Sequence, residues 1–184
     1  MVEILSLSQL DASIKKELVS GKIFIYPTDT IYGLGCNAKK KESVITIREI
    51  KKRDAKPFSV IAPSKEWIYH HFVIFNKHYI QQLPGPYTFI LTMKQRCVSS
   101  AVNNGLPTLG VRIPNHPFTS YLSIPFITTS VNYSGKSPIQ EIKQIPSGIK
   151  KRVDYIIDDG PLYNKPSTLV DLTDAVPKII KRER

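Results

Sequence analysis

Short β-rich runs that end at proline or glycine most constrain how this chain can fold. Such runs recur along the sequence and alternate with segments of helical spacing. The expected strands lie at residues 22–26, 58–62, 87–93, 109–113, 125–129, 154–157, 167–172 and 178–180. Strands that alternate with helices predict an α/β layered domain. The pattern does not assign strand directions, so a parallel sheet and a mixed sheet both stay open.

Segments with apolar residues one helical turn apart separate these runs. The expected helices lie at residues 8–20, 42–52, 79–83 and 139–149. Gly21 directly follows the first of them, and glycine is the typical residue at a helix C-terminus. Pro146 should shorten or kink the last one, because proline cannot donate a helical hydrogen bond.

The composition fits one globular domain over residues 1–184. Apolar residues make up 41% of the chain and charged residues 22%, which excludes wholesale disorder and a coiled-coil rod. The 26 lysines and arginines exceed the 15 acidic residues, so the formal charge is +11. This charge attracts polyphosphates, nucleic acid or an anionic membrane surface without choosing among them.

The cysteines and the N-terminus predict a protein of the reducing cytoplasm. Cys36 and Cys97 lie far apart in no metal-ligand spacing, so we expect neither a structural disulfide nor a zinc site. The N-terminus lacks a basic segment followed by an apolar run and a cleavage site, so we expect no signal peptide. Every apolar run is shorter than the roughly 20 residues of a membrane span, and we expect no membrane association.

Several common catalytic signatures are missing from the sequence. There is no G-x-x-x-x-G-K-[ST] phosphate loop, no G-x-G-x-x-G turn after a strand, no H-E-x-x-H helix and no G-x-S-x-G nucleophile turn. The four histidines form no recognisable catalytic pair. The familiar hydrolase and P-loop functions are therefore excluded.

Six loop segments beside expected strands carry hydroxyls, glycines or a cation instead. In order they are P-T-D-T-I-Y-G-L-G at 27–35, K-K-R-D-A-K-P at 51–57, P-G-P-Y-T at 84–88, G-V-R-I-P at 110–114, T-S-V-N-Y-S-G at 129–135 and P-S-T at 166–168. Hydroxyls, backbone N–H groups and cations are the groups that hold phosphates and carboxylates. Each segment alone reads equally well as an ordinary turn.

Taken together and in this order, the segments resemble the YrdC/TsaC family of threonylcarbamoyl-AMP synthases. The resemblance implies an open, twisted mixed α/β sheet with flanking helices and a basic cavity. It implies a nucleotidyltransferase that condenses L-threonine, bicarbonate or CO2, and ATP into L-threonylcarbamoyladenylate and pyrophosphate. In the family, a downstream threonylcarbamoyl transferase complex uses this product for the t6A modification of adenosine 37 in tRNAs that read codons beginning with A.

The resemblance also assigns residues to each substrate. For L-threonine they are Thr30, Arg112, Ser130 and Ser167. For ATP they are Lys51, Arg53, Lys56, Thr108, Asn132, Ser134 and Lys181. An arginine suits a carboxylate because its planar fork donates two parallel hydrogen bonds. No residue is assigned as an acid or base, and we expect Mg²⁺ to bind mainly through the triphosphate rather than through an acidic cluster.

The sequence departs from the family pattern at three places. The loop between Arg53 and Pro57 is one residue shorter than usual, which loosens the alignment of Lys56. Lys181 stands where relatives often have an arginine that touches ATP, so the charge is kept but the fork is lost. Ile61 stands where longer relatives have a histidine.

Two other functions stay open at this point. A domain of this fold with a charge of +11 would also serve as a double-stranded RNA or tRNA-binding module, and such binding would weaken steeply with salt. The other alternative is the carbamoyl-adenylate domain of hydrogenase maturation proteins. That domain normally lies within a longer chain with acylphosphatase and zinc-finger segments, neither of which is found in this sequence.

Overall fold

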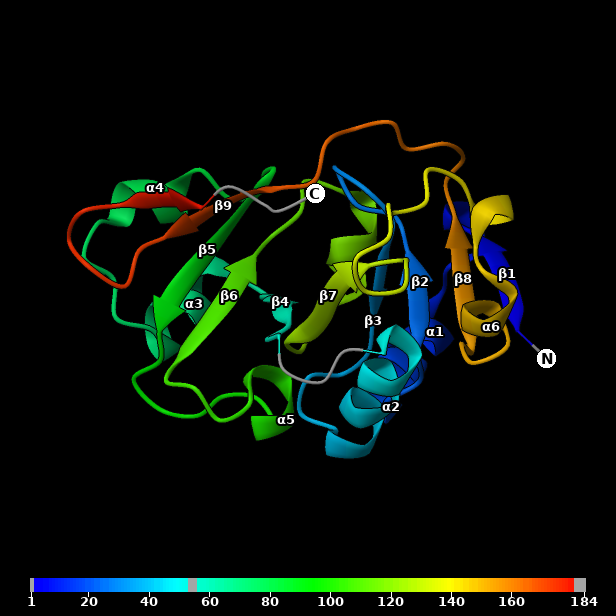
Figure 1. The fold of residues 1–184 in the computed structure, drawn as a ribbon, viewed down its shortest axis with the longest axis horizontal. Coiled ribbons are helices and arrows are strands. Elements are labelled where there is room, and N and C mark those ends of the chain that lie inside the picture. The colour runs from blue at the N-terminus through cyan, green and yellow to red at the C-terminus, as the bar shows by residue number, and fades with distance from the viewer. Residues whose placement is uncertain (1, 53–55, 181–184) are drawn as a thin grey trace.

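The chain folds around one ten-stranded sheet (Figure 1). The computed structural model describes residues 2–52 and 56–180. The strands are β1 (Glu3–Ser6), β2 (Phe24–Tyr26), β3 (Gly33–Gly35), β4 (Ser59–Ile61), β5 (Tyr87–Thr92), β6 (Thr108–Arg112), β7 (Phe126–Ser130), β8 (Tyr155–Asp158), β9 (Thr168–Asp171) and β10 (Lys178–Ile180). Their spatial order is β1-β8-β2-β3-β7-β4-β6-β5-β9-β10.

Parallel and antiparallel pairs mix within this sheet. The strand β8 is parallel to both β1 and β2, and β4–β6 and β5–β9 are also parallel pairs. The other neighbouring strands are antiparallel. Figure 1 shows the sheet twisting across the molecule from β1 at one side to β9 at the other. The prediction of an open, twisted mixed α/β sheet is therefore confirmed.

Helices and short 3-10 turns flank the sheet. They are α1 (Ala12–Ser20), α2 (Lys41–Lys51), α3 (Lys65–His71), α4 (Lys77–Gln81), α5 (Ser100–Asn103), α6 (Ser147–Lys150), η1 (Leu7–Gln9), η2 (Pro117–Tyr121) and η3 (Ile142–Gln144). Asp11 caps α1 by accepting a hydrogen bond from Ser13 N, and Gly21 ends it at a φ of 104°. Among the described residues, no helix has the length and apolar character needed to cross a membrane.

The two faces of the sheet bury different sets of apolar side chains. On one face, a core that includes Val60 and Val111 packs beneath α2 and α3. On the other face, an aromatic cluster packs beneath α1 and η2, where the rings of Tyr26 and Phe118 stack at 4.8 Å between centroids. Ile61 is fully buried in this cluster.

Beyond the aromatic cluster, small residues line the second face. The strand register pairs Ser59 of β4 with both Gly110 of β6 and Thr128 of β7, so these residues point to the same side of the sheet. A Cβ atom at Gly110 would lie 2.4 Å from Ser59 Oγ, so a larger residue there would force its neighbour to move. This small-residue floor leaves room above the sheet, directly beside the aromatic cluster.

Several features of the fold differ from the expectations drawn from the sequence. The helix expected over residues 139–149 is wrong, because that segment holds only η3 and α6. Pro146 cannot continue a helix from the preceding residues and instead stands at the N-cap of α6. The strands β1 and β3 and the helices α3 and α5 were also not expected from the sequence. For β3 the reason is its G-L-G sequence, which has little β-strand preference.

Replacement of Gly110 by alanine should lower the free energy of unfolding by about 1–3 kcal/mol, because the new methyl group collides with Ser59 Oγ. Urea denaturation measures this change. In a Ser59→Ala background the same substitution should cost less, because the colliding oxygen is gone. Equal costs in the two backgrounds would show that the collision is not the cause.

Candidate functional site

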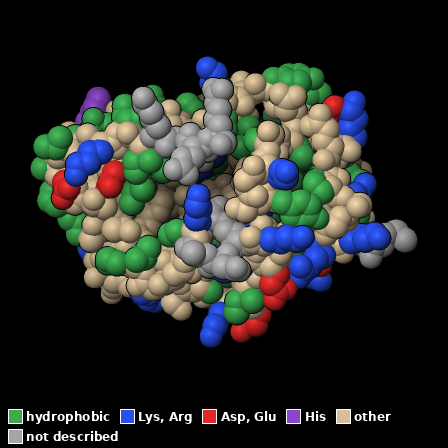
Figure 2. Space-filling view, in the orientation of Figure 1, with side chains coloured by type: hydrophobic (Ala, Val, Ile, Leu, Met, Phe, Trp, Pro, Cys, Tyr) green, Lys and Arg blue, Asp and Glu red, His purple; other side chains and the backbone are tan. Residues whose placement is uncertain are grey.

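A cavity of about 130 Å³ lies over the small-residue floor, and Figure 2 shows a hollow in this face of the molecule. Its lining residues are Ile31, Tyr32, Gly33, Pro57, Phe58, Ser59, Thr88, Arg112, Thr128, Thr129, Ser130, Pro166 and Ser167. All the loop segments singled out in the sequence contribute to this list. Segments that are far apart along the chain therefore meet around one space.

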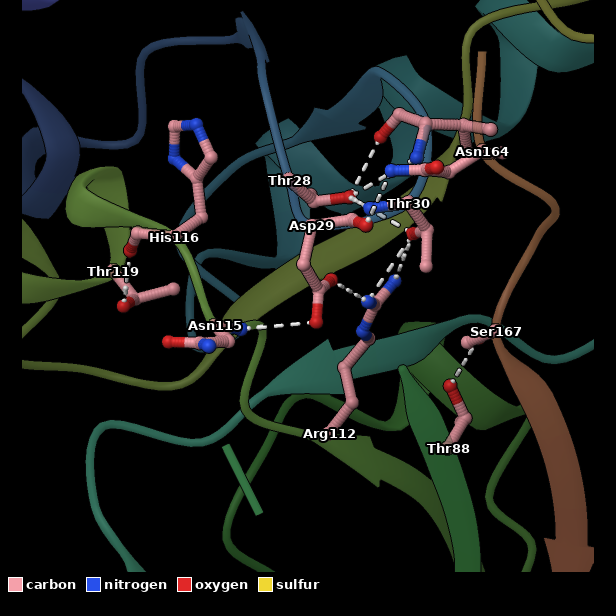
Figure 3. Close-up of polar contacts among 11 residues, drawn as sticks. Thr28, Asp29, Thr30, Thr88, Arg112, Asn115, His116, Thr119, Asn164 and Ser167 are labelled. Atoms are coloured by element: carbon pink, nitrogen blue, oxygen red, sulfur yellow. Dashed lines mark hydrogen bonds and ion pairs between the residues drawn. The ribbon is translucent and has the colours of Figure 1, made fainter. Parts of the chain in front are cut away.

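Arg112, the last residue of β6, is the cation among the described lining residues. Its Nη2 donates to Asp29 Oδ1 at 2.6 Å, and its Nη1 and Nη2 donate to Thr30 Oγ1 at 3.3 and 3.2 Å (Figure 3). The side chains of Arg112 and Asp29 are only 6% and 11% exposed. Since water screens a buried pair poorly, this ion pair couples β6 strongly to the loop after β2.

Asp29 is itself held in place by its surroundings. Its Oδ2 accepts a hydrogen bond from Asn115 N at 3.0 Å, and its carbonyl oxygen accepts one from Asn164 Nδ2 at 3.1 Å (Figure 3). The neighbouring Thr28 Oγ1 accepts from Ile31 N at 3.2 Å and donates to Ile31 O at 2.7 Å. The loop that carries Asp29 is thus a tightly bonded turn.

A second wall of the cavity carries two buried hydroxyls. Thr88 Oγ1 of β5 lies 2.8 Å from Ser167 Oγ, which directly precedes β9 (Figure 3). The two residues are 2% and 4% exposed. Ser167 therefore shares the cavity with Arg112, and both had been predicted to bind the same substrate.

Lys51 contacts Ser130, the last residue of β7, and is not among the described residues that line the cavity. It is 1% exposed, and its Nζ donates to Ser130 O and to Asn132 Oδ1, both at 2.5 Å. Ser130 Oγ also donates to Asn132 Oδ1 at 2.6 Å. The Lys51 ammonium thus stabilises the segment that carries two predicted ligand residues, and a direct contact of Lys51 with ATP stays a prediction.

The remaining residues predicted to bind ATP lie toward one end of the floor or outside the described chain. Thr108 begins β6 at the end of the sheet where β7 finishes with Ser130, four residues along the strand from Arg112. Lys56 and Ser134 are exposed on loops. Two further predicted residues, Arg53 and Lys181, lie outside the described residues.

Tyr32 is a fully buried residue of the cavity lining whose hydroxyl is bonded outside the cavity. Burial raises the pKa of its phenol to about 12, so the group stays protonated at neutral pH. The hydroxyl donates to Gly160 O at 2.7 Å and accepts from Asp159 N at 3.0 Å. It therefore ties the cavity wall to the connection between β8 and β9.

Asp29 and Thr88 were not predicted as functional residues, although both stand in the loop segments named above. An aspartate between proline and threonine residues reads as a turn residue, and a threonine in a β-rich run reads as a strand former. Only the fold shows that Asp29 faces Arg112 and that Thr88 faces Ser167.

Comparison with known proteins places the chain in a family. The model of the Sua5/YciO/YrdC family, described as "Telomere recombination", matches residues 16–183. This chain belongs to the Sua5/YciO/YrdC family. A Methanocaldococcus jannaschii relative named "Putative threonylcarbamoyl-AMP synthase" is 38% identical over 167 residues, which cover 88% of this chain and 79% of the relative. A Bacillus subtilis relative named "Threonylcarbamoyl-AMP synthase" is 28% identical over 184 residues, covering 89% of this chain and 50% of the relative.

Solved structures of Sua5 and YciO share the fold of this family member. P. abyssi Sua5 complexed with L-threonine matches with a TM-score of 0.85 at 26% identity, covering 97% of this chain and 56% of that one. E. coli YciO matches with a TM-score of 0.85 at 26% identity, covering 98% of this chain and 95% of that one. This chain thus spans little more than half of Sua5 and nearly all of YciO. The family and the fold predicted from the sequence are confirmed.

Replacement of Asp29 by asparagine should lower the free energy of unfolding by about 3 kcal/mol, because the Arg112 guanidinium would stay buried without its counter-charge. Chemical denaturation measures this change. Asp174→Asn is the matched control, since the Asp174–Lys178 pair is 66% and 64% exposed and its loss should cost about 0.5 kcal/mol or less. Equal losses in the two variants would contradict a strong buried pair.

Proposed function

We propose that this member of the Sua5/YciO/YrdC family is an L-threonylcarbamoyladenylate synthase. It condenses L-threonine, CO2 or bicarbonate, and ATP, and it releases pyrophosphate. The observation that carries the proposal is Arg112, a buried guanidinium in the wall of a hydroxyl-lined cavity. The names of relatives as threonylcarbamoyl-AMP synthases and the L-threonine complex of Sua5 support it.

The amino acid binds at the Arg112 end of the cavity in this proposal. The guanidinium receives the carboxylate, and the hydroxyls of Thr30, Ser130 and Ser167 surround the substrate. Asp29 already balances the charge of Arg112, so this buried pair carries no net charge. A zwitterionic amino acid suits such a site because it also enters without net charge.

The chemical step needs positioning more than a dedicated acid or base. The threonine ammonium first loses a proton to solvent. The resulting amine bonds to the carbon of CO2, and loss of a second proton gives a carbamate. A carbamate oxygen then attacks the α-phosphorus of ATP, and the bond to pyrophosphate breaks. The cavity's hydroxyls and cation orient the reacting groups. Apolar walls, including Ile31, Phe58 and Pro166, limit the access of water to the carbamate.

ATP occupies the other end of the floor in this proposal. Its predicted contacts are Lys51, Arg53, Lys56, Thr108, Asn132, Ser134 and Lys181. The Lys51 ammonium also holds Ser130 and Asn132 in place by hydrogen bonds. Mg²⁺ arrives with the nucleotide as part of the substrate and is coordinated mainly by triphosphate oxygens.

The product of this reaction is a reactive mixed anhydride that another enzyme has to consume. We place the protein in the cytoplasm, upstream of a threonylcarbamoyl transferase complex that modifies tRNA to t6A. The charge of +11 also favours contact with tRNA or double-stranded RNA. Such contact is a secondary property in this proposal, and its strength should fall steeply as salt rises.

Purified protein should release pyrophosphate from ATP and Mg²⁺ only when both L-threonine and bicarbonate are present. A coupled pyrophosphate assay measures the release, and mass spectrometry identifies threonylcarbamoyl-AMP. Release with carbamoyl phosphate in place of threonine would instead indicate chemistry of the hydrogenase-maturation type. Salt-sensitive RNA binding without any pyrophosphate release would show an RNA-binding module.

Replacement of Arg112 by lysine should raise the KM for L-threonine roughly 10- to 100-fold, because the charge stays but the two-pronged contact with the carboxylate is lost. Steady-state kinetics with threonine and ATP varied separately measure the effect. Arg152→Lys is the matched control, since Arg152 lies in an exposed pair with Glu49. An unchanged threonine KM in the Arg112 variant would show that Arg112 does not bind the carboxylate of L-threonine.

A further inference from the structure

The segment P-G-P-Y-T at 84–88 lines the cavity through Thr88, yet the proposed function gives this residue no task. We propose that Thr88 is a positioning residue that orients the Ser167 hydroxyl toward the bound amino acid. This inference rests on the proposed function and deepens it. It assigns a specific part of threonine recognition to a side chain that does not need to touch the substrate.

Thr88 lies between Arg112 and Ser167, the two residues proposed to bind the carboxylate of the amino acid. The antiparallel register pairs Phe89 with Val111, so the next residues, Thr88 and Arg112, lie opposite each other on the same face. On its other side, Thr88 Oγ1 lies 2.8 Å from Ser167 Oγ. Thr88 therefore lies next to both residues that are assigned to the substrate at this end (Figure 3).

The backbone around this pair is fixed by the sheet. Thr168 N donates to Pro86 O at 2.9 Å, and Tyr87 pairs with Thr168 where β9 begins. Thr88 is β-branched, and a β-branched side chain has few χ1 rotamers. The position of its hydroxyl is thus set by the strand, whereas serine is unbranched and its hydroxyl can adopt more rotamers. The Thr88 hydroxyl can therefore hold the Ser167 hydroxyl in one direction.

A pair of hydroxyls has two protons and uses one of them in its mutual hydrogen bond. When Thr88 donates to Ser167 Oγ, the proton of Ser167 is directed away from Thr88. A carboxylate oxygen held by Arg112 is a suitable acceptor for that proton. In this arrangement Thr88 makes Ser167 a donor to the substrate, and loss of the Thr88 hydroxyl removes the hydrogen bond that sets the direction of that donor.

The test is Thr88→Val, which removes the hydroxyl and nearly keeps the shape of the side chain. We expect the KM for L-threonine to rise about tenfold, the size of effect that one hydrogen bond supplies, with the KM for ATP changed less than about twofold. Thr88→Ser keeps the hydroxyl and should restore most of the lost affinity. Thr119→Val, which removes the hydroxyl that donates to His116 O at 2.7 Å outside the cavity, should leave both constants unchanged.

A double-mutant cycle separates positioning from a general loss of packing. If Thr88 acts through Ser167, Thr88→Val should have no further effect on the threonine KM in a Ser167→Ala background. Additive effects in the double variant would overturn the inference, as would a Thr88→Val enzyme with unchanged threonine KM. Equal rises in the KM for threonine and ATP would also overturn it, because they indicate a general disturbance of the cavity.

The same measurements distinguish this inference from the function on which it rests. A wild-type protein that releases pyrophosphate only with threonine and bicarbonate, together with a silent Thr88→Val variant, refutes the role of Thr88 alone. A wild-type protein without threonine-dependent release refutes the proposed function, and the role of Thr88 falls with it.

Discussion

The buried ion pair between Arg112 and Asp29 is the interaction on which the cavity depends. It joins β6 to the loop after β2, two segments that are 83 residues apart in sequence. Asn115 and Asn164 bind Asp29 from two further segments, so the pair also fixes the loop after β6 and the connection that leads to β9. A charge pair of this kind specifies one arrangement of these segments, because any other arrangement would leave a buried charge without its partner.

The sheet makes room for this pair because one of its faces carries large side chains in one part and small residues in the next. Aromatic side chains such as Phe118 and Phe126 fill the face beneath α1 and η2. Next to them, Ser59, Gly110 and Thr128 expose little more than backbone and hydroxyls. The hydrophobic core and the cavity thus lie side by side on one surface, and the tight packing of the first part supports a hollow in the second.

The sequence predicted which loop segments line the cavity better than it predicted the contacts between them. Loop motifs that follow strands are recognisable by their glycines and hydroxyls, which is why the sequence predicts one site for Arg112 and Ser167, and both residues line the same cavity. The burial of Lys51 was not predictable, because a lysine in a basic helix reads as a solvated residue. The role of Asp29 was equally hidden, since its partner lies on a distant strand. Local sequence patterns predict turns and strands, whereas pairings between residues far apart in the sequence can be recognised only in the folded structure.

The connection between β8 and β9 is anchored at three successive points around the cavity. Gly160 O binds Tyr32, Asn164 binds the backbone of Asp29, and Ser167 binds Thr88. Since both ends and the middle are attached to walls of the same space, the number of residues between the anchors sets how far apart those walls stand. The length of this connection, rather than its composition, should therefore determine how much room the cavity offers.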